Sequence, residues 1–434
     1  MSRKKFEKKV LRNGLTVLVE RVPSQAVSIG YWVKTGTRYE TAEETGMAHF
    51  LEHMLFKGTP SYDAQKITDE IERVGGDLNA FTSRESTCFH VLLLKKHAAL
   101  GFKVLSEILL HSHFPADELK KERKVVLQEI SMVEDMPEEQ VFDYLFERIY
   151  GNSGLGKPIL GKPSHVRKMD RDKIKKFFKK YYRPENMVVS VCGDLTLEEV
   201  LKKLKPLSSL QWPGRKKASK QKKFTYEKAP PQKQGMWWKN AQFEQAHVLW
   251  SVPVPEWCLK DRIPLSVFNL WFGGGMSSLL YQEIRERSGL AYSVYSMHFP
   301  YPDTGDLTVY LGCESAQVRS ALKKIEIIGK KIMRDGISKQ QLKNTQMNLE
   351  GTILLGQDNV EAKMVSNAHY ELFSTRRLTV RDVMKRIHSV KESQIQKIAE
   401  DLFKHSERAI YVLGKHPSKK EQKKLKDYSF EWIR

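Results

Sequence analysis

The chain has 434 residues, of which 40% are hydrophobic and 29% are charged. This composition is typical of a soluble globular protein and excludes a disordered chain. The formal net charge of +21 would attract anions or nucleic acid. Most lysines, however, lie in helix-like segments as a solvated face, so we expect no specific nucleic-acid partner.

Neither a disulfide framework nor a membrane segment is expected. The four cysteines, at positions 88, 192, 258 and 313, are far apart and form no CxxC pair, which argues against disulfides and against a cysteine zinc site. No run of about 18 apolar residues occurs, so we expect no membrane span. The first fifteen residues lack the apolar core of a secretory signal. We therefore expect a cytoplasmic protein.

The first half of the chain alternates strands and helices. Apolar runs bounded by turn residues indicate strands, and apolar residues at helical spacing indicate helices. The predicted strands are 15–20, 27–34, one or two within 77–94, and 187–192. The predicted helices are 46–56, 63–74, 98–110, 117–133, 137–150 and 196–204. This order is typical of an α+β or α/β layer.

The second half repeats this order. The predicted strands are 246–254, 291–299, 307–313 and 409–413, and the predicted helices are 265–270, 276–287, 316–335 and 339–355. Prolines and a lysine cluster with little periodicity separate the two halves and indicate a linker. We predict an α+β protein of two homologous domains, 1–210 and 236–434, joined by a linker at 211–235. Each domain is expected to be a mostly antiparallel sheet packed with helices.

One predicted helix carries His49-Phe50-Leu51-Glu52-His53, an H-x-x-E-H motif. The two histidines stand at i and i+4, so both imidazoles can bind one metal ion from the same helical face. Glu52 points toward the same region and can take a proton from a water whose pKa zinc lowers to about 7. The motif predicts peptide hydrolysis, although a structural role for the histidines would produce the same residues.

A catalytic zinc site needs a third protein ligand and one open position. The predicted helix 117–133 offers Glu122 and Glu129, which lie about two turns apart on one face. Glu129 is the candidate third ligand, and Glu122 is a candidate to hydrogen-bond a zinc-bound histidine. Ligands of these types would also accept manganese or cobalt.

The segment from Gly46 to Thr59 resembles the active-site segment of the insulinase, or pitrilysin, family of zinc metallopeptidases. The similarity is greatest to the bacterial type of its mitochondrial-processing-peptidase-like branch. In that family the third ligand lies about 76 residues after the second histidine. Here Glu129 lies at that separation from His53, since 129 − 53 = 76. The resemblance implies one zinc ion per subunit, held by His49, His53 and Glu129.

The remaining roles that the resemblance implies concern Glu52 and the substrate. Glu52 becomes the general base and Glu122 a supporting residue. Peptide substrate would add as a strand beside Asn79, Ala80 and Phe81, which could otherwise be an ordinary strand end. In the second half, Arg285 and Tyr292 resemble the Arg/Tyr pair that this family places in the opposite half of its chamber. Arg285 would hold substrate carbonyls, and Tyr292 would stabilise the oxyanion. Without the resemblance, Arg285 would be a helix surface residue and Tyr292 a strand residue in the core.

The resemblance also implies an assembly. Larger relatives join four such domains into a clam-like closed chamber, so a chain with two should pair with another chain. Because the zinc motif and the Arg/Tyr pair both occur here, we expect a homodimer acting on peptides or unfolded segments, while a heterodimer with a motif-poor homologue stays open. The alternative functions are a non-catalytic assembly subunit of the same fold and a protein that binds nucleic acid through its charge.

Overall fold

The computed structural model describes residues 5–209, 227–373, 377–404 and 408–433, and the chain divides into two compact units. Unit 1 comprises Met1–Met132, Asn152–Glu227 and Gly356–Arg377; unit 2 comprises Val133–Gly151, Lys228–Leu355 and Leu378–Arg434. The units differ from the predicted domain ranges in two exchanged segments, 133–151 and 356–377. Most of the predicted linker, 211–226, lies outside the described residues. Among the described helices, none has the length and hydropathy that a membrane crossing requires.

The sheet of unit 1 has six strands in the order β1-β2-β6-β3-β5-β4. Their bounds are β1 Phe6–Val10, β2 Thr16–Arg21, β3 Ala26–Val33, β4 Asp77–Thr82, β5 Thr87–Leu94 and β6 Met187–Gly193. Strands β2 and β6 run parallel, and the other neighbouring pairs are antiparallel. The central strands β3 and β6 are almost wholly buried, so both faces of the sheet are covered.

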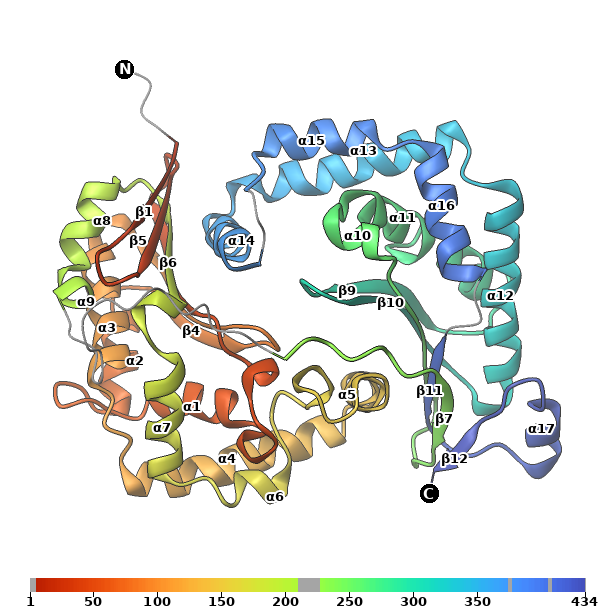
Figure 1. Ribbon diagram of the computed structural model, residues 1–434, viewed down its shortest axis with the longest axis horizontal. Helices are drawn as coiled ribbons and strands as arrows, with labels where there is room; N and C mark the ends of the chain where they lie inside the picture. Colours follow the sequence, from red (N-terminus) through yellow and green to blue (C-terminus); the bar gives the residue numbers. More distant parts are fainter. Residues whose placement is uncertain (1–4, 210–226, 374–376, 405–407, 434) are drawn as a thin grey trace. The chain divides into compact units, whose positions relative to one another are not determined.

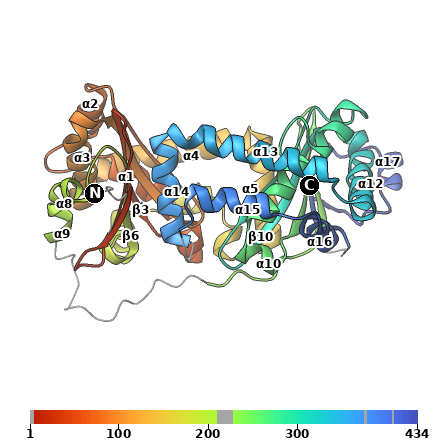
Figure 2. The ribbon, with the colours of Figure 1, turned by 90° about the horizontal axis from the view of Figure 1, so that it is seen from above.

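Helices from different parts of the chain cover the two faces of this sheet. Val27, Ile29 and Tyr31 of β3 share a core with α1 and α3, whereas Trp32 points to the opposite face and packs with α14. This alternation follows the period of two of a strand. Figures 1 and 2 show α2 and α3 on one side of the sheet and α14 on the other. The helix bounds are α1 Met47–Leu55, α2 Ala64–Glu72, α3 Ala98–His111, α4 Ala116–Glu134, α6 Pro163–Val166, α7 Arg171–Tyr181, α8 Leu197–Lys203, α9 Lys205–Ser209 and α14 Val360–Phe373.

The sheet of unit 2 has six strands in the order β12-β7-β11-β8-β10-β9. Their bounds are β7 Gly235–Lys239, β8 Ala246–Pro253, β9 Ser293–Pro300, β10 Gly305–Cys313, β11 Ala409–Leu413 and β12 Glu431–Ile433. The run β7-β11-β8-β10-β9 has the same strand directions as β2-β6-β3-β5-β4 of unit 1. This shared topology supports the predicted homology of the two halves.

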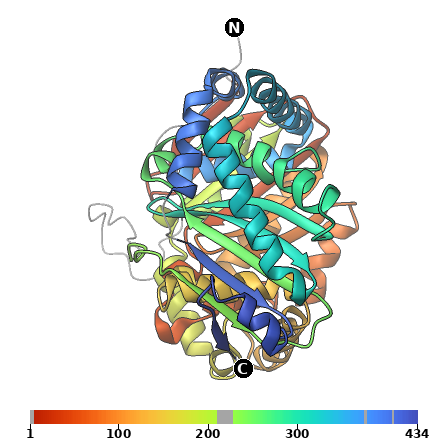
Figure 3. The same ribbon diagram turned by 90° about the vertical axis from the view of Figure 1, so that its right-hand side faces the viewer.

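Unit 2 is also covered on both faces. Val248 and Trp250 of β8 share a core with α11, α12 and α16, and Figure 3 faces this layer with the teal helix α12 in front. On the opposite face, α5 stacks Phe142 on Tyr310. The helix bounds are α5 Pro137–Tyr150, α10 Glu256–Lys260, α11 Ile263–Gly273, α12 Val318–Asp335, α13 Lys339–Leu355, α15 Val380–Ser389, α16 Glu392–Phe403 and α17 Lys419–Lys424.

The predicted two-domain α+β fold is confirmed. Most predicted elements lie within a few residues of the observed ones, and helix 137–150 has the bounds of α5. The predicted helix 276–287 differs, because it opens with turns and contains a π-helical segment, Tyr281–Glu286. Strands β1, β7 and β12 and helices α6, α9, α10 and α14 to α17 were not predicted. The clam-like dimer stays a prediction.

Candidate metal centre and catalytic site

Helix α1 presents the H-x-x-E-H motif from a well-anchored start. Its N-cap, Gly46, has a φ of 84°, which glycine adopts without strain. A Cβ at this position would also lie 2.7 Å from Cα of Gly161. The carboxylate of Glu40 accepts hydrogen bonds from the backbone N–H groups of Gly46 and Ala48 at 2.9 and 2.8 Å. An oxygen acceptor at a helix N-terminus satisfies N–H groups that have no partner within the helix.

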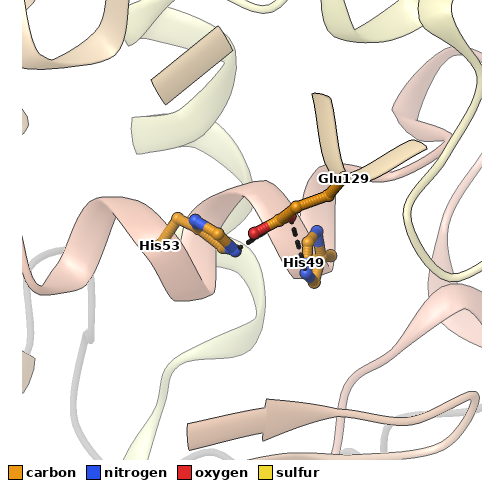
Figure 4. A group of neighbouring side chains, drawn as sticks. All are labelled: His49, His53 and Glu129. Carbon is orange, nitrogen blue, oxygen red and sulfur yellow. Dashed lines mark ion pairs between the residues drawn. The ribbon is translucent and has the colours of Figure 1, made fainter. Parts of the chain in front are cut away.

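Three side chains from α1 and α4 point toward one another, as Figure 4 shows. Glu129 Oε2 lies 3.9 Å from His49 Nε2 and 3.5 Å from His53 Nε2. One ligand atom from each of the three residues lies within 4.8 Å of the other two. Ligands bound tetrahedrally at zinc distances would be about 3.4 Å apart. The separations therefore suit a single metal ion.

The chemistry of these groups also fits a metal. Glu129 Oε2 and His49 Nδ1 are buried without a hydrogen-bond partner among the described residues, and a bound cation would satisfy the carboxylate oxygen. Burial, with a contribution from His53, lowers the pKa of His49 to about 3. His49 is therefore a neutral imidazole, which is the form that binds metal. The residues present fit a zinc ion.

Glu122 of α4 holds His53 from the side away from the metal. Its Oε2 lies 2.9 Å from His53 Nδ1, and its Oε1 lies 2.6 Å from Lys57 Nζ. Burial alone would raise the pKa of Glu122, but the hydrogen bonds to His53 and Lys57 lower it. The carboxylate is thus ionised and leaves His53 Nε2 directed at Glu129. A carboxylate on the outer nitrogen of a metal-binding histidine is a common arrangement in zinc sites.

Glu52 lies on α1, next to His53, and its side chain is buried. The side chain of Thr82, the last residue of β4, donates a hydrogen bond to Glu52 Oε2 at 2.5 Å. Burial raises the pKa of Glu52, and the hydrogen bond from Thr82 and the charge of His53 counteract this in part. The carboxylate therefore lies in a desolvated environment, unlike that of a surface acid.

Strand β4 brings the predicted substrate residues to the edge of the sheet. Within the described residues β4 is the last strand in the order, so one side of its backbone has no strand partner there. Asn79 and Phe81 alternate with Ala80, whose side chain packs against the main core of unit 1. The Phe81 side chain is 36% exposed and its ring lies 5.4 Å from that of Trp32.

Arg285 and Tyr292 lie in unit 2 and contact each other. The guanidinium of Arg285 lies 4.8 Å from the ring centres of both Tyr281 and Tyr292. Tyr292 is 71% exposed, and its backbone N–H bonds to Gly312 O. The side chain is thus available to a ligand, which a strand residue in the core would not be.

Sequence reasoning missed three residues that support the site: Glu40, Lys57 and Thr82. Lys57 follows α1 and binds Glu122. Thr82 ends β4 and bonds to Glu52. The contacts of Lys57 and Thr82 have no local signal, because each joins residues that are distant in the sequence. For Glu40 the sequence offers one signal, because an acidic residue a few positions before a helix can accept hydrogen bonds from the N–H groups of the first turn.

Comparison with known proteins identifies the family. Residues 15–163 match the family described as Insulinase (Peptidase family M16), and residues 168–349 match the Peptidase M16 inactive domain. An uncharacterized zinc protease of Bacillus subtilis, YmxG, is 35% identical over 90% of this chain and 94% of its own length. The chain belongs to the insulinase family of peptidases. An uncharacterized zinc protease of Mycobacterium leprae, 34% identical over 94% of this chain and 92% of its own length, is a further relative.

Solved structures share the insulinase-family fold of this chain. A protease from Helicobacter pylori superposes with a TM-score of 0.87 at 23% identity, covering 94% of this chain and 99% of that chain. A peptidase M16 inactive domain from Pseudomonas fluorescens gives 0.83 at 18% identity, covering 95% and 99%. Because relatives over almost the whole chain are named zinc proteases, membership in this family supports a peptidase function.

Proposed function

We propose that this protein is a zinc-dependent endopeptidase that hydrolyses peptides or unfolded segments bound in extended form. The observation that carries the proposal is the meeting of His49 Nε2, His53 Nε2 and Glu129 Oε2 beside the buried carboxylate of Glu52. One zinc ion per subunit would supply Lewis-acid chemistry there, lowering the pKa of a water and polarising the scissile carbonyl.

Glu52 serves as the general base. Thr82 occupies its Oε2, while Oε1 accepts no hydrogen bond from any residue that the structure describes. Oε1 is therefore the atom that takes a proton from the attacking water and later delivers it to the leaving amine. The raised pKa of Glu52, caused first by burial, brings the carboxylate closer to the range in which such a transfer is efficient.

The free edge of β4 is proposed to bind the substrate backbone. An extended peptide that adds to this edge would hydrogen-bond the main chain around Asn79 and Ala80. Its alternate side chains would point to opposite faces, as in any strand. Phe81, partly exposed on its own face, offers an aromatic contact to one of them. The charge of +21 favours acidic peptides among the possible substrates.

Arg285 and Tyr292 are proposed to act on the substrate in a homodimer. The exposed Tyr292 hydroxyl would donate to the oxyanion of the tetrahedral intermediate, and Arg285 would bind substrate carbonyls. Each site would combine metal ligands of one subunit with this pair from the other subunit. A mixed dimer of Arg285→Ala and Glu52→Gln chains should then recover activity that neither variant has alone. Failure of that mixture to cleave peptide would argue against a shared site, and a heterodimer would become the better proposal.

The decisive experiment compares wild type, Glu52→Gln and Glu129→Gln. Bound metal is measured in each purified protein, followed by cleavage of a quenched peptide library containing acidic and basic members. Wild type and Glu52→Gln should hold zinc, Glu129→Gln should hold less, and wild type alone should cleave. Glu118→Gln alters a half-buried glutamate on the same helix as Glu129, which pairs with Lys121. It is the matched control and should retain both properties.

The alternative is a non-catalytic assembly subunit of the same fold. It predicts that wild type neither binds zinc tightly nor cleaves any member of the library. The buried carboxylate oxygen of Glu129 without a partner favours the metal-binding proposal, because a subunit without metal gains nothing from a buried oxygen that accepts no hydrogen bond.

A further inference from the structure

The contact between Thr82 and Glu52 joins an edge strand to the helix that carries the motif. The two residues are separated by 30 positions, and their side chains meet at 2.5 Å. In β4, Leu78 and Ala80 pack on the core that contains α1, and Thr82 continues that side of the strand. The Thr82 hydroxyl therefore points at α1, while Asn79 and Phe81 point to the other face.

Hydrogen-bond accounting assigns the Thr82 proton to Glu52. The neighbouring hydroxyl, Thr87 Oγ1, donates its own proton to Thr35 O at 2.9 Å. It lies 3.4 Å from Thr82 Oγ1, so it can be no more than a weak acceptor for Thr82. An ionised carboxylate can only accept. Thr82 is thus the donor to Glu52, and a charge-assisted bond of this kind is stronger than one between neutral groups.

Threonine is suited to holding another side chain in place. Its branched Cβ restricts χ1, so little rotamer freedom is lost when its hydroxyl is directed at one acceptor. Glu52 has three rotatable side-chain bonds and a two-fold symmetric carboxylate. A fixed donor on Oε2 selects one orientation and leaves Oε1 for the reacting water.

We propose that Thr82 is a positioning residue that orients the general base and links it to substrate docking on β4. This inference rests on the proposed function. The backbone of β4 would receive the substrate strand, and the side chain at the end of the same strand holds Glu52. A peptide that straightens or shifts the edge of β4 would therefore adjust the Glu52 carboxylate as it binds.

The test compares Thr82→Val, Thr82→Ser and Thr87→Val in the full-length protein. Valine keeps the shape of threonine and removes the hydroxyl, and serine keeps the hydroxyl. Thr87→Val makes the same change on the paired strand, where the hydroxyl bonds to a backbone carbonyl. Steady-state cleavage of a quenched peptide, bound zinc and the thermal transition are measured for each variant.

Thr82→Val should lower kcat by about 10- to 100-fold, since small misplacements of a reacting group have effects of this order. Its KM and zinc content should match wild type, Thr82→Ser should recover kcat to within several-fold, and Thr87→Val should keep kcat. In a Glu52→Gln background, Thr82→Val should cause no further loss, because the base through which Thr82 acts is already absent.

Two results would overturn the inference and leave the proposed function intact. One is a Thr82→Val variant with wild-type kcat, and the other is a variant that loses zinc or its thermal transition together with activity, which would make Thr82 merely structural. An inactive wild type with no bound zinc would instead remove the proposed function itself, and the inference with it.

Discussion

The hydroxyl of Tyr150 donates a hydrogen bond to Asp306 Oδ2 at 2.9 Å, and this contact ties α5 to the sheet of unit 2. Both residues are buried. Unit 1 has a counterpart: the side-chain amide of Asn367, on α14, donates to the buried carboxylate of Glu20 on β2 at 2.9 Å. Each sheet therefore binds a helix from the other half of the sequence through a buried carboxylate. The position of each exchanged helix is thus fixed by a polar contact as well as by apolar packing.

Tyr150→Phe should destabilise unit 2. The change removes a donor to a buried carboxylate and leaves Gln232, which donates to the Tyr150 hydroxyl at 3.0 Å, with one bond fewer. Loss of a buried partner of a charged group costs about 1–3 kcal/mol. The free energy of unfolding from urea titration should fall by this amount, with faster hydrogen exchange in α5. Tyr292→Phe, which alters an exposed hydroxyl, is the control; equal midpoints for both variants would show that the Tyr150 contact contributes little.

Glu122→Gln should weaken zinc binding. The substitution replaces the carboxylate on His53 Nδ1 by an amide and removes the partner of Lys57, so the imidazole loses orientation and basicity. Such changes typically cost 10- to 100-fold in metal affinity. Competition with a chelator of known affinity measures the effect, and Glu118→Gln, which alters a half-buried glutamate paired with Lys121 on the same helix, should behave as wild type. A Glu122→Gln protein that retains wild-type affinity would limit this residue to a packing role.

Arg38 and Glu85 should show strong coupling in stability. Arg38 Nη1 lies 2.7 Å from Glu85 Oε1, and their side chains are 1% and 10% exposed. Removing one member of a buried ion pair costs about 3–5 kcal/mol, whereas removing both with apolar replacements costs less. In a double-mutant cycle, Arg38→Met should therefore destabilise more than Arg38→Met with Glu85→Leu. Additive effects of the two substitutions would mean that the charges are compensated elsewhere.

Asp194 should give unit 1 a stability contribution that depends on pH. Hydrogen bonds from Lys95 and Arg21 lower its pKa in the folded protein below the ordinary value of 3.8. Asp194 therefore binds a proton more tightly in the unfolded chain than in the folded protein. Its contribution to stability is fully present above pH 3.8 and is lost as the pH falls through the folded pKa.

Asp194→Asn should therefore lower the urea midpoint at pH 7, and its difference from wild type should shrink below pH 3.8. Asp69→Asn, at an exposed position of α2, serves as the control and should leave the midpoint unchanged. A difference for Asp194→Asn that persists undiminished at low pH would assign the effect to packing and not to the charge.

The part of the site that depends on local geometry could be predicted from the sequence. His49 and His53 are one helical turn apart, and a helix places such residues on one face wherever it packs. The predicted helix 46–56 corresponds to α1, Met47–Leu55. Glu129 could be proposed because it shares a helical face with Glu122, and the structure brings both toward the histidines of α1. The roles of these residues in catalysis stay predictions.

The contacts between distant segments were decided by the tertiary structure alone. Thr82 had no signal that pointed to Glu52, because strand periodicity says which face a side chain occupies and not which helix lies beneath it. The bounds of α5 were predicted correctly, yet its position on the sheet of unit 2 was not, since an apolar helical face does not specify the sheet that will bury it. The sequence by itself determined most of the elements and the metal-binding pattern on α1. Which elements pack together depends on the shapes of their surfaces and on contacts to buried residues such as Asp306 and Glu20. These contacts form only when the chain folds.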